Sequence, residues 1–564
     1  MPPLPTPLDT PAIADLDDPL YYLRNFDTVV DWVHERHGDL LLPRETTRLA
    51  AFRTLDTASR GLLVRLVMRT GEHFRGDRLD YPELGKPMTA AVAPLLEQGW
   101  LTANPELSLT QAAALLTLPE LRDRWRPLIE QAGLRRSLGK RALVDALAPH
   151  HPAPRPADCW GFGPQTPVLA LQDMALFDRI RLMFFGNLYQ GWSDFVLVQL
   201  GLQRYEPVPL SRQSRAFQSR AEVDGYLALD RCLQQLEDAP AAEVWPEVPG
   251  PFTDNPWLES RRGRLLFELG LRAERQGNRP LALAALAASA YREARLRYLR
   301  LLERDQQHWR AWELARLAQL SPRSRAEARG CERLVRRLAG KLGEAPPPAR
   351  SAPSIREWSL TLPASSELPV ELTVAQHLDL PESPVVYVEN ALLNGLFGLL
   401  CWPALYTPLP GAFFHPFHAG PADLQREDFV TRRRDLFSRC LAQLDDGRYR
   451  QAIRQTWRAK QGITNPFVAW SVLTEDVLEL ALKCIPPHHL RQVFERLLAD
   501  LTEHRSGLPD LVRFDPASAD YELIEVKGPG DRLQDHQRHW LEWFAGEGIQ
   551  ASVCYVHWRP EVDS

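Results

Sequence analysis

The chain has 564 residues, of which 45% are hydrophobic and 25% charged, so it is long enough to form several folded domains. Its formal net charge of −5 excludes a uniformly basic nucleic-acid coat protein, and any DNA binding must come from local patches. The seven cysteines form no Cys-x-x-Cys pair, which argues against zinc fingers and favours reduced thiols in a cytoplasm.

The N-terminal stretch is rich in proline and lacks the basic and apolar regions of a signal peptide. The most apolar run, residues 391–406, is interrupted by Asn394 and Pro403 and is too short to span a bilayer. We therefore expect a soluble cytoplasmic protein that does not bind membranes.

Proline clusters at residues 149–167, 240–256 and 344–353 predict linkers that divide the chain. We expect a multidomain, mainly α-helical protein whose last domain is α/β. The expected domains are a helical N-terminal DNA-binding domain (1–105), a small helix-pair module (106–150), a helical connecting domain (168–240), a helical array (256–342) and a C-terminal domain (366–564).

In the first domain, a helix predicted over residues 62–69 places Arg65 and Arg69 four positions apart on one side. Such a pair can contact DNA phosphates. A solvated helix face is the other interpretation of the same spacing.

The pattern at residues 106–150 predicts two short helices. Thr117 and Glu120 fit a capping box at the start of the first helix, and the second helix begins near Lys140. A helix pair with this Gly-x-Lys entry resembles a SAP module, a small DNA-binding motif in which Lys140 would face phosphates. The same surface would carry Arg135, Arg136 and Arg141. An ordinary helical hairpin is the alternative.

Between residues 258 and 337 the pattern predicts a helical array that resembles tetratricopeptide repeats. The expected helices are 258–276, 281–303, 309–320 and 326–338. This segment holds 19 arginines and no lysine against nine acidic residues. So concentrated a positive charge is typical of a nucleic-acid-binding surface, and arginines that only solvate exposed faces are the alternative.

Arg261, Arg262 and Arg264 lie at the start of the first helix of this array. The amide groups of a helix N-terminus and nearby guanidinium groups can bind a phosphate together. We therefore expect these three arginines to contact DNA.

The C-terminal domain contains the pattern with the most specific chemistry. Asp510, which follows Pro509, precedes a predicted strand at residues 511–514. Glu525 and Lys527 lie on a second predicted strand, residues 522–527, which a Gly-Pro-Gly sequence ends. If the two strands form a hairpin, Asp510 lies beside Glu525.

Residues i and i+2 of a strand point to one face, so Glu525 and Lys527 point together while Val526 points into a core. Asp510 and Glu525 can then hold a hard divalent cation such as Mg²⁺ or Mn²⁺. Lys527 can orient the attacking water or stabilise charge on the phosphate. An exposed Glu–Lys pair on an edge strand is the alternative interpretation.

Glu389 follows a predicted strand, residues 385–388, and is either a third metal ligand or the cap of the next helix. The insert between Glu389 and Asp510 is predicted to contain helices 423–444, 449–460, 466–483 and 490–504. After Lys527, the pattern predicts a helix at 533–544 and a strand at 549–556, with Arg532 and Gln537 near the metal site. His415 and His418 have aromatic neighbours and are expected to be packing or surface residues rather than zinc ligands.

The segment from His504 to Asp510, His-Arg-Ser-Gly-Leu-Pro-Asp, followed by Leu-Ile-Glu-Val-Lys-Gly-Pro-Gly at 523–530, resembles the VRR-NUC motif of the PD-(D/E)xK nuclease superfamily. More narrowly, the chain resembles the bacterial form of the Fanconi-associated nuclease family. Tyr21 to Phe26, Leu63 to Leu66, the SAP-like pair, the helical repeats and Glu389-Asn390 follow in the family's order. The ubiquitin-binding zinc finger of animal members has no counterpart here.

The resemblance implies a VRR-NUC nuclease domain with a helical insert, preceded by helical, SAP-like and TPR-like domains. It implies a structure-specific endonuclease and 5′-to-3′ exonuclease that cuts 5′ flaps and acts in DNA interstrand crosslink repair. The partner would be branched or flapped double-stranded DNA with a 5′ phosphate, bound by one protomer at the bacterial nucleoid. A dimeric Holliday-junction resolvase and a non-catalytic branched-DNA scaffold are the alternatives.

The resemblance also implies the roles of particular residues. One or two Mg²⁺ or Mn²⁺ ions would be bound by Glu389, Asp510, Glu525 and the carbonyl group of Val526, with Lys527 assisting the water. The family's basic pocket for a 5′ phosphate would fall among the arginines near Arg261 to Arg264. Further DNA contacts in the nuclease domain are expected from Arg505, Arg532 and Gln537.

Overall fold

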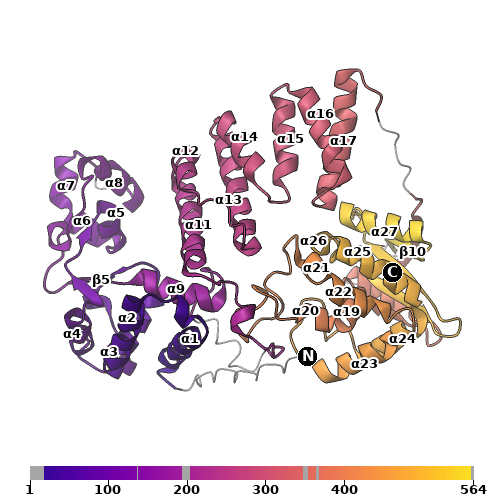
Figure 1. Ribbon diagram of the computed structural model, residues 1–564, viewed down its shortest axis with the longest axis horizontal. Coiled ribbons are helices and arrows are strands. Elements are labelled where there is room, and N and C mark those ends of the chain that lie inside the picture. The colour runs from indigo at the N-terminus through magenta and orange to yellow at the C-terminus, as the bar shows by residue number, and fades with distance from the viewer. Residues whose placement is uncertain (1–17, 136, 193–202, 347–352, 364–367, 560–564) are drawn as a thin grey trace, which may run out of the picture. The chain divides into compact units, whose positions relative to one another are not determined.

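The computed structural model describes residues 18–135, 137–192, 203–346, 353–363 and 368–559 (Figure 1). The chain forms two compact units. The first comprises Met1–Leu202 and Phe217–Val223, and the second comprises Gln203–Ala216 and Asp224–Ser564. None of the described helices has the length and apolar character needed to cross a membrane.

The first unit is built on helices that pack around an aromatic core. Phe26, Phe52, Trp100 and Phe177 are almost fully buried, and neighbouring rings in this group lie 5.4–6.3 Å apart. The helices that supply or surround this core are α1 (Tyr21–His37), α2 (Pro43–Thr54), α3 (Thr57–Val67), α4 (Thr89–Glu97) and α9 (Met174–Phe185).

A small antiparallel sheet also belongs to the first unit, although the sequence pattern predicted only helices there. Its strand order is β1-β5-β2. The strands are β1 (His73–Arg75), β2 (Leu101–Ala103) and β5 (Val168–Leu171). Because β5 comes from the segment predicted as a helical connector, this segment starts with a strand. Residues 193–202 of the same segment lie outside the described residues.

The helix-pair module forms its own core within the first unit. Thr117 and Glu120 make the predicted capping box, in which the Thr117 backbone N–H donates to Glu120 Oε2 over 2.8 Å. Leu121, Trp125 and Leu143 are buried in a shared apolar cluster. The elements are β3 (Glu106–Leu107), α5 (Leu109–Ala114), α6 (Leu118–Arg124), α7 (Arg126–Gln131), α8 (Lys140–Leu147) and β4 (Arg155–Pro156).

The helical array of the second unit stacks successive helices against one another. It contains α11 (Arg220–Asp238, whose first residues belong to the first unit), α12 (Ala241–Val244), α13 (Pro256–Arg275), α14 (Arg279–Ala288), α15 (Ala294–Arg304), α16 (His308–Leu320) and α17 (Arg325–Leu342). The prediction of one helix over 281–303 is wrong, because α14 ends before Ser289. Ser289 is extended, and its hydroxyl donates to the Gly263 carbonyl over 2.5 Å, which turns the chain back onto α13.

The C-terminal domain is organised by a five-stranded mixed sheet with the order β6-β10-β9-β8-β7. The strands are β6 (Arg356–Pro363), β7 (Val385–Tyr387), β8 (Leu511–Asp515), β9 (Asp520–Lys527) and β10 (Ala551–Arg559). The predicted hairpin is confirmed, since β8 and β9 pair antiparallel. The edge-strand interpretation is wrong, because β9 lies in the middle of the sheet. The predicted domain start at residue 366 lies after β6, which pairs with β10.

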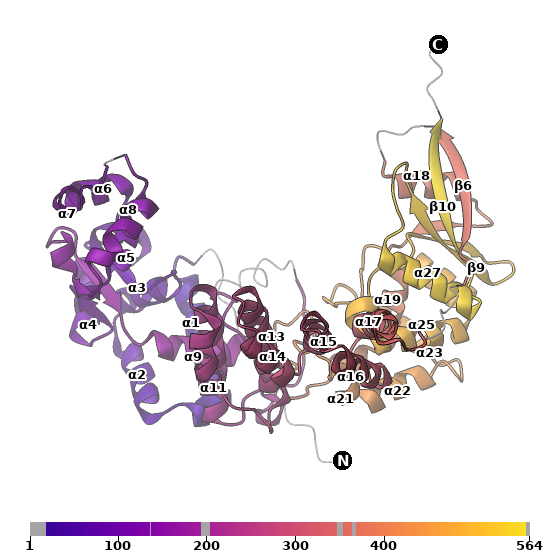
Figure 2. The same ribbon diagram turned by 90° about the horizontal axis from the view of Figure 1, so that it is seen from above.

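Helices that lie outside the insert in sequence also pack against this sheet. Helix α18 (Val370–Leu378) shares an apolar core with the strands, and Val374, Ile524 and Val526 are buried in it. Helix α27 (Asp535–Glu547) lies along the sheet near β10 (Figure 2). The Ile524 and Val526 side chains therefore line one face of β9, and Glu525 and Lys527 lie on the other.

The insert between β7 and β8 is helical, as predicted, but its helices are shorter than expected. Only the helix at 449–460 has the predicted bounds. Residues 423–444 hold two short helices, and residues 466–483 hold one helix that begins at Glu475. The segment 490–504 is split at Asp500, which caps a new turn through the Glu503 N–H. The helices are α19 (Leu392–Leu400), α20 (Trp402–Leu405), α21 (Phe429–Arg432), α22 (Arg434–Ala442), α23 (Tyr449–Lys460), α24 (Glu475–Cys484), α25 (Pro487–Ala499) and α26 (Leu501–His504).

Candidate active site

Three segments of the chain meet at one end of the five-stranded C-terminal sheet. Asp510 directly precedes β8, Glu525 lies on β9, and Leu511 pairs with Ile524, so Asp510 is placed beside Glu525. The backbone N–H groups of Val388 and Glu389 both donate to the Asp510 carbonyl, over 2.8 and 3.0 Å. The sheet thus brings Glu389 to Asp510 across the whole helical insert.

Glu525 is a fully buried carboxylate on the central strand. Its exposed fraction is 0%, and Lys527 Nζ forms an ion pair with its Oε1 over 2.7 Å. Within the described chain, neither carboxylate oxygen accepts a hydrogen bond of regular geometry. Burial raises the pKa of Glu525 to about 7, and the nearby Asp510 carboxylate adds to this, while Lys527 opposes it. The residue therefore lies where negative charge is costly without a cation.

Asp510 is held by the backbone of the adjacent strand. Its Oδ2 accepts a hydrogen bond of 2.9 Å from the Val526 N–H. Burial raises the pKa of Asp510, against the lowering effects of that hydrogen bond and of Lys527. Glu371 and Glu389 raise this pKa further through their negative charge.

Glu371 is a residue of this site that the sequence pattern did not reveal. It lies in the first turn of α18, where an acidic residue ordinarily only stabilises the helix terminus. The α18 terminus is close to the end of β9, since a Cβ on Gly528 would lie 3.6 Å from Val370. The charge of Glu371 also acts on Tyr387. The charges of Glu371 and Glu389 thus both act on Asp510, and those of Asp510 and Glu389 act on Glu525.

Glu389 is anchored by a tyrosine two positions earlier. The Tyr387 hydroxyl donates to Glu389 Oε2 over 2.5 Å. This hydrogen bond is the main cause that raises the pKa of Tyr387, and burial adds to it, so the hydroxyl stays a donor at neutral pH. The capping interpretation of Glu389 finds no support in the helix that follows, since no side chain caps the N-terminus of α19.

The donor set of this site fits a hard divalent cation. Two neighbouring buried carboxylates with raised pKa values, one of them without hydrogen-bond donors of regular geometry, are stabilised when a cation shares their oxygens. In the described residues, no three histidine, cysteine, aspartate or glutamate side chains are already arranged as a closed metal cage. The carboxylate of Glu389, which points to Tyr387, would have to share its second oxygen with an ion.

A tight loop positions Asp510. Gly507 has a φ of +84°, and a Cβ there would lie 2.5–3.0 Å from His536, including its backbone carbonyl group. Asn390, which also has a positive φ, accepts a hydrogen bond of 3.0 Å from the Leu508 N–H through its Oδ1. The residue after Glu389 thus fastens the loop that carries Asp510.

The three DNA contacts predicted in the C-terminal domain have different surroundings. Arg505 is half-buried, donates to the Pro466 carbonyl and stacks on Phe467, so it holds the insert in place. Gln537 accepts from the Gln534 N–H and caps α27. Arg532 is exposed and has no ion-pair partner among the described residues. Of the three, the structure leaves Arg532 most available to a ligand.

The arginines predicted at the start of α13 are mostly engaged by the protein. Arg261 stacks on Tyr226, with 4.1 Å between the guanidinium carbon and the ring centroid. Arg262 donates to the Pro249 carbonyl over 2.8 Å and to Glu259 over 3.0 Å. Arg264 is exposed and has no ion-pair partner in the described chain.

In the first unit, two of the three predicted DNA contacts are engaged within the protein. Arg65 forms an ion pair with Glu83 over 2.6 Å, and Lys140 Nζ donates to the Leu116 carbonyl over 2.8 Å. Arg69 lines an open groove of about 620 Å³ together with Arg78. Of the residues predicted to flank Lys140, Arg136 lies outside the described residues.

An arginine-lined cavity of about 970 Å³ lies between the helical array and the C-terminal domain, within the second unit. Arg292, Arg300 and Arg333 line it and have no ion-pair partner among the described residues. His536, which contacts the Gly507 loop, lines the same cavity. We call this space the arginine cavity. Its lining also includes the acidic residues Glu293, Glu327, Asp500, Glu503 and Asp535, so its positive charge comes from the arginines without a carboxylate partner, Arg300 and Arg333.

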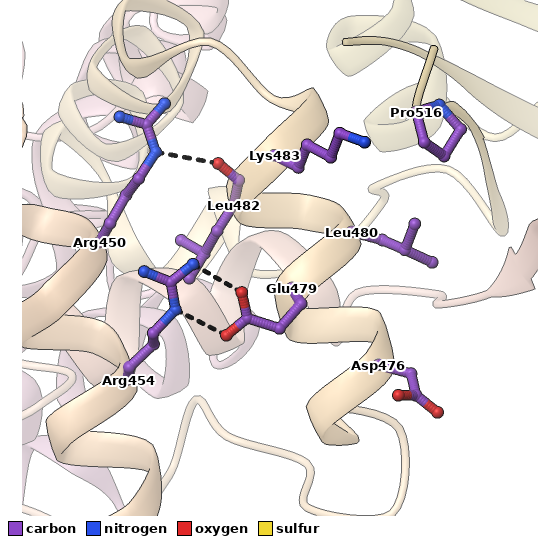
Figure 3. Close-up of a pocket in the computed structure, with 8 residues that line it drawn as sticks. All are labelled: Arg450, Arg454, Asp476, Glu479, Leu480, Leu482, Lys483 and Pro516. Atoms are coloured by element: carbon purple, nitrogen blue, oxygen red, sulfur yellow. Dashed lines mark hydrogen bonds and ion pairs between the residues drawn. The ribbon is translucent and has the colours of Figure 1, made fainter.

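A separate pocket of about 640 Å³ lies on the insert (Figure 3). Its two arginines are already engaged, because Arg454 forms a double hydrogen bond with Glu479 and Arg450 donates to the Leu482 carbonyl. Lys483 points toward Pro516 in the β8–β9 turn. With both arginines engaged, Lys483 is the remaining cation of this pocket, and the acidic Asp476 also lines it.

Three sequence-family models match the chain. They are described as the VRR-NUC domain (residues 444–558), the FAN1 HTH domain (residues 20–102) and the Fanconi anemia-associated nuclease SAP domain (residues 106–160). The Fanconi-associated nuclease 1 homolog of Pseudomonas aeruginosa is 47% identical over 559 residues, which cover 99% of each chain. Fanconi-associated nuclease 1 of Homo sapiens is 24% identical, over 95% of this chain and 62% of its own length.

Solved structures give the same result for the fold. A crystal structure of paFAN1 bound to DNA with a 2-nucleotide 5′ flap and a gap matches with a TM-score of 0.84 and 47% identity, over 98% of this chain and 100% of the other. A second structure of paFAN1, bound to DNA with a 1-nucleotide 5′ flap and a gap, matches with a TM-score of 0.83 over 96% of this chain.

Proposed function

The chain belongs to the Fanconi-associated nuclease family, and from this membership we propose that it is a metal-dependent nuclease that cuts branched DNA at 5′ flaps. The observation that carries the proposal is the convergence of Asp510, Glu525 and Lys527 on two paired strands, with Glu389 fixed to the Asp510 backbone. We further propose 5′-to-3′ trimming and a role in interstrand crosslink repair, in line with the family.

A VRR-NUC nuclease depends on divalent metal ions, and we propose that Mg²⁺ or Mn²⁺ serves here. Glu389, Asp510, Glu525 and the Val526 carbonyl would hold the first ion. Glu371 is our candidate for a further ligand, since its charge already acts on Asp510. When bound, the metal supplies an activated water and stabilises the leaving oxygen.

The protein side chains perform the remaining tasks. Lys527, paired with Glu525, is placed to orient the attacking water and to donate to the phosphate as negative charge builds up. Tyr387 fixes the Glu389 carboxylate by its hydrogen bond. Central burial of β9 excludes bulk water from around Glu525, which strengthens these electrostatic contacts.

We propose that the arginine cavity receives the 5′-terminal phosphate of the substrate. A terminal phosphate carries more than one negative charge, and the guanidiniums of Arg300 and Arg333, which have no ion-pair partner among the described residues, suit such an anion. His536 lines the cavity and lies against Gly507 in the loop that carries Asp510. A DNA strand whose 5′ end is bound in the cavity would therefore bring a phosphodiester bond near that end to the metal site.

Product analysis on end-labelled DNA tests this function. Flap, nicked, gapped and four-way substrates are incubated with Mg²⁺ or Mn²⁺, and the products are sized on a sequencing gel. A flap nuclease gives nicks near the 5′ flap junction. Paired symmetric nicks in the four-way substrate would indicate a dimeric resolvase instead, and no cleavage of any substrate would indicate a DNA-binding scaffold.

We expect a monomer on DNA and a cytoplasmic, nucleoid-associated location.

A further inference from the structure

The α17 helix carries a row of arginines that continues beyond the arginine cavity. Arg329, Arg333, Arg336 and Arg337 recur at spacings of four, three and one, which places them on one side of the helix. They line a shallow groove of about 440 Å³ together with Glu332. Arg329 and Arg333 also line the arginine cavity, so groove and cavity form one continuous surface.

The charge in this groove is only partly neutralised by the protein. Arg337 forms two hydrogen bonds with Glu303, and Arg329 pairs with Glu503 over 2.6 Å. A guanidinium nitrogen of Arg336 lies 3.6 Å from a Glu332 carboxylate oxygen. So long and exposed an ion pair neutralises little of the Arg336 charge. Arg333 has no ion-pair partner among the described residues. The groove therefore keeps a net positive charge in the free protein.

Crowding of like charges supports this view. Burial lowers the pKa of Arg300, and the neighbouring guanidiniums of Arg333, Arg297 and Arg337 lower it further. An anion in the groove would relieve that repulsion. Since several arginines line the path at successive helical turns, about 5.4 Å apart, the anion that fits best is a polymer with regularly spaced charges.

The lining also indicates which form of nucleic acid suits the groove. The residues that line it come from one helix and include no aromatic side chain, so the groove has no platform on which bases stack. Its contacts would be ionic and directed to the backbone, independent of sequence. The path begins at the cavity proposed for the terminal phosphate and follows a single helix. It therefore suits a single strand of DNA.

We propose that the arginine row of α17 binds the backbone of a single-stranded 5′ flap that is longer than the arginine cavity can hold. The inference rests on the proposed flap nuclease function and deepens it, because it predicts where a long flap leaves the active site. A short flap ends in the cavity and does not reach Arg336, whereas a flap of about twelve nucleotides lies along the row.

Arg336→Glu tests the proposal, because Arg336 lines the groove but not the cavity. Arg310→Glu on α16 is the matched control, since Arg310 is exposed and hydrogen-bonds only weakly, to Gln307 over 3.4 Å. Two substrates share the same duplexes and carry flaps of one or about twelve nucleotides. Binding is measured by fluorescence anisotropy without metal, and cleavage under single-turnover conditions with Mn²⁺.

For Arg336→Glu we expect about tenfold weaker binding and slower cleavage of the long flap, and a salt dependence of binding whose slope falls by about one. The one-nucleotide flap should be bound and cut within about twofold of the wild-type values. An equal loss on both substrates, no loss on the long flap, or the same loss in Arg310→Glu would overturn the proposal. The binding assay decides this even if the wild-type protein cuts neither flap, a result that would instead overturn the proposed function.

Discussion

The Tyr387 hydroxyl donates a 2.5 Å hydrogen bond to Glu389 Oε2 and leaves Oε1 of the same carboxylate available for a cation. A residue that orients a metal ligand in this way typically changes metal affinity or activity about 10- to 100-fold when it is lost. Tyr387 is therefore a positioning residue for the proposed metal site.

We predict that Tyr387→Phe raises the Mn²⁺ concentration needed for half-maximal cleavage about tenfold. Cleavage at saturating Mn²⁺ should stay within about threefold, because the ligands themselves are retained. A metal titration of single-turnover cleavage measures both values. An unchanged or lower half-saturating concentration would show that the tyrosine does not position Glu389 for metal binding.

Gly507→Ala should displace the loop that carries Asp510. Alanine at a positive φ costs about 1–2 kcal/mol, and its Cβ would in addition meet the His536 backbone at 2.9–3.0 Å. Gly530→Ala is the matched control, because Gly530 has a similar φ of +89° with nothing within 4 Å of a Cβ. We predict more than tenfold slower cleavage for Gly507→Ala and less than threefold for the control. Equal activities of the two variants would contradict the role of this contact.

If the arginine cavity binds the 5′ phosphate, Arg300 is expected to contact that phosphate. Arg300→Ala should slow cleavage of a 5′-phosphorylated flap about 10- to 100-fold, as expected for losing one charged hydrogen bond, and should change the unphosphorylated flap less than threefold. Arg264→Ala, which removes an exposed arginine outside the cavity, should affect both substrates equally. A phosphate-specific loss in Arg264→Ala instead would place the phosphate at the start of α13.

The order of these residues in the sequence explains which parts of the site could be predicted. Asp510, Glu525 and Lys527 belong to one hairpin, so strand periodicity and a Gly-Pro-Gly end were enough to place them together. Glu371 has no such signal, because its approach to Asp510 depends on how α18 packs against the sheet. The unpaired state of Arg300 and Arg333 likewise depends on which neighbours in the fold carry carboxylates.

The same reasoning applies to the fold. The sheet β1-β5-β2 was missed, because its strands are only three or four residues long and β5 pairs with strands far earlier in the chain, for example Ala170 with His73 and Leu171 with Leu101. The split of the helix predicted at 281–303 was missed as well. Its cause is a contact between Ser289 and Gly263, which no local propensity reports.

His415, which is buried, and His418, which is half-buried, predict a loss of stability in acid. Burial holds the pKa of His415 well below its usual value, with His418 adding to the effect, and burial lowers the pKa of His418 to about 4. Because the unfolded chain binds these protons near pH 6.5, the stability present at neutral pH is lost as the pH falls from about 6.5 toward 4. Each histidine contributes about 1.4 kcal/mol per pH unit in this window.

Urea unfolding at pH 7.5 and 5.5 measures this effect. His418→Gln should show a smaller decrease in unfolding free energy between the two pH values than the wild type, since glutamine does not titrate. Its amide oxygen can still accept from the Phe414 N–H, as His418 Nε2 does over 3.4 Å. An identical decrease in both proteins would show that His418 titrates normally in the folded state.

The most direct test of the account is metal-dependent incision of an end-labelled 5′ flap by wild type and Asp510→Asn. Asparagine keeps the size of Asp510 and can still accept from the Val526 N–H, but it removes the negative charge needed to hold a cation. We predict that the wild type cuts only when Mg²⁺ or Mn²⁺ is present, and that Asp510→Asn cuts about 1,000-fold more slowly while its DNA affinity changes only a few-fold. Undiminished cleavage by a clean preparation of Asp510→Asn would contradict the assignment of the active site.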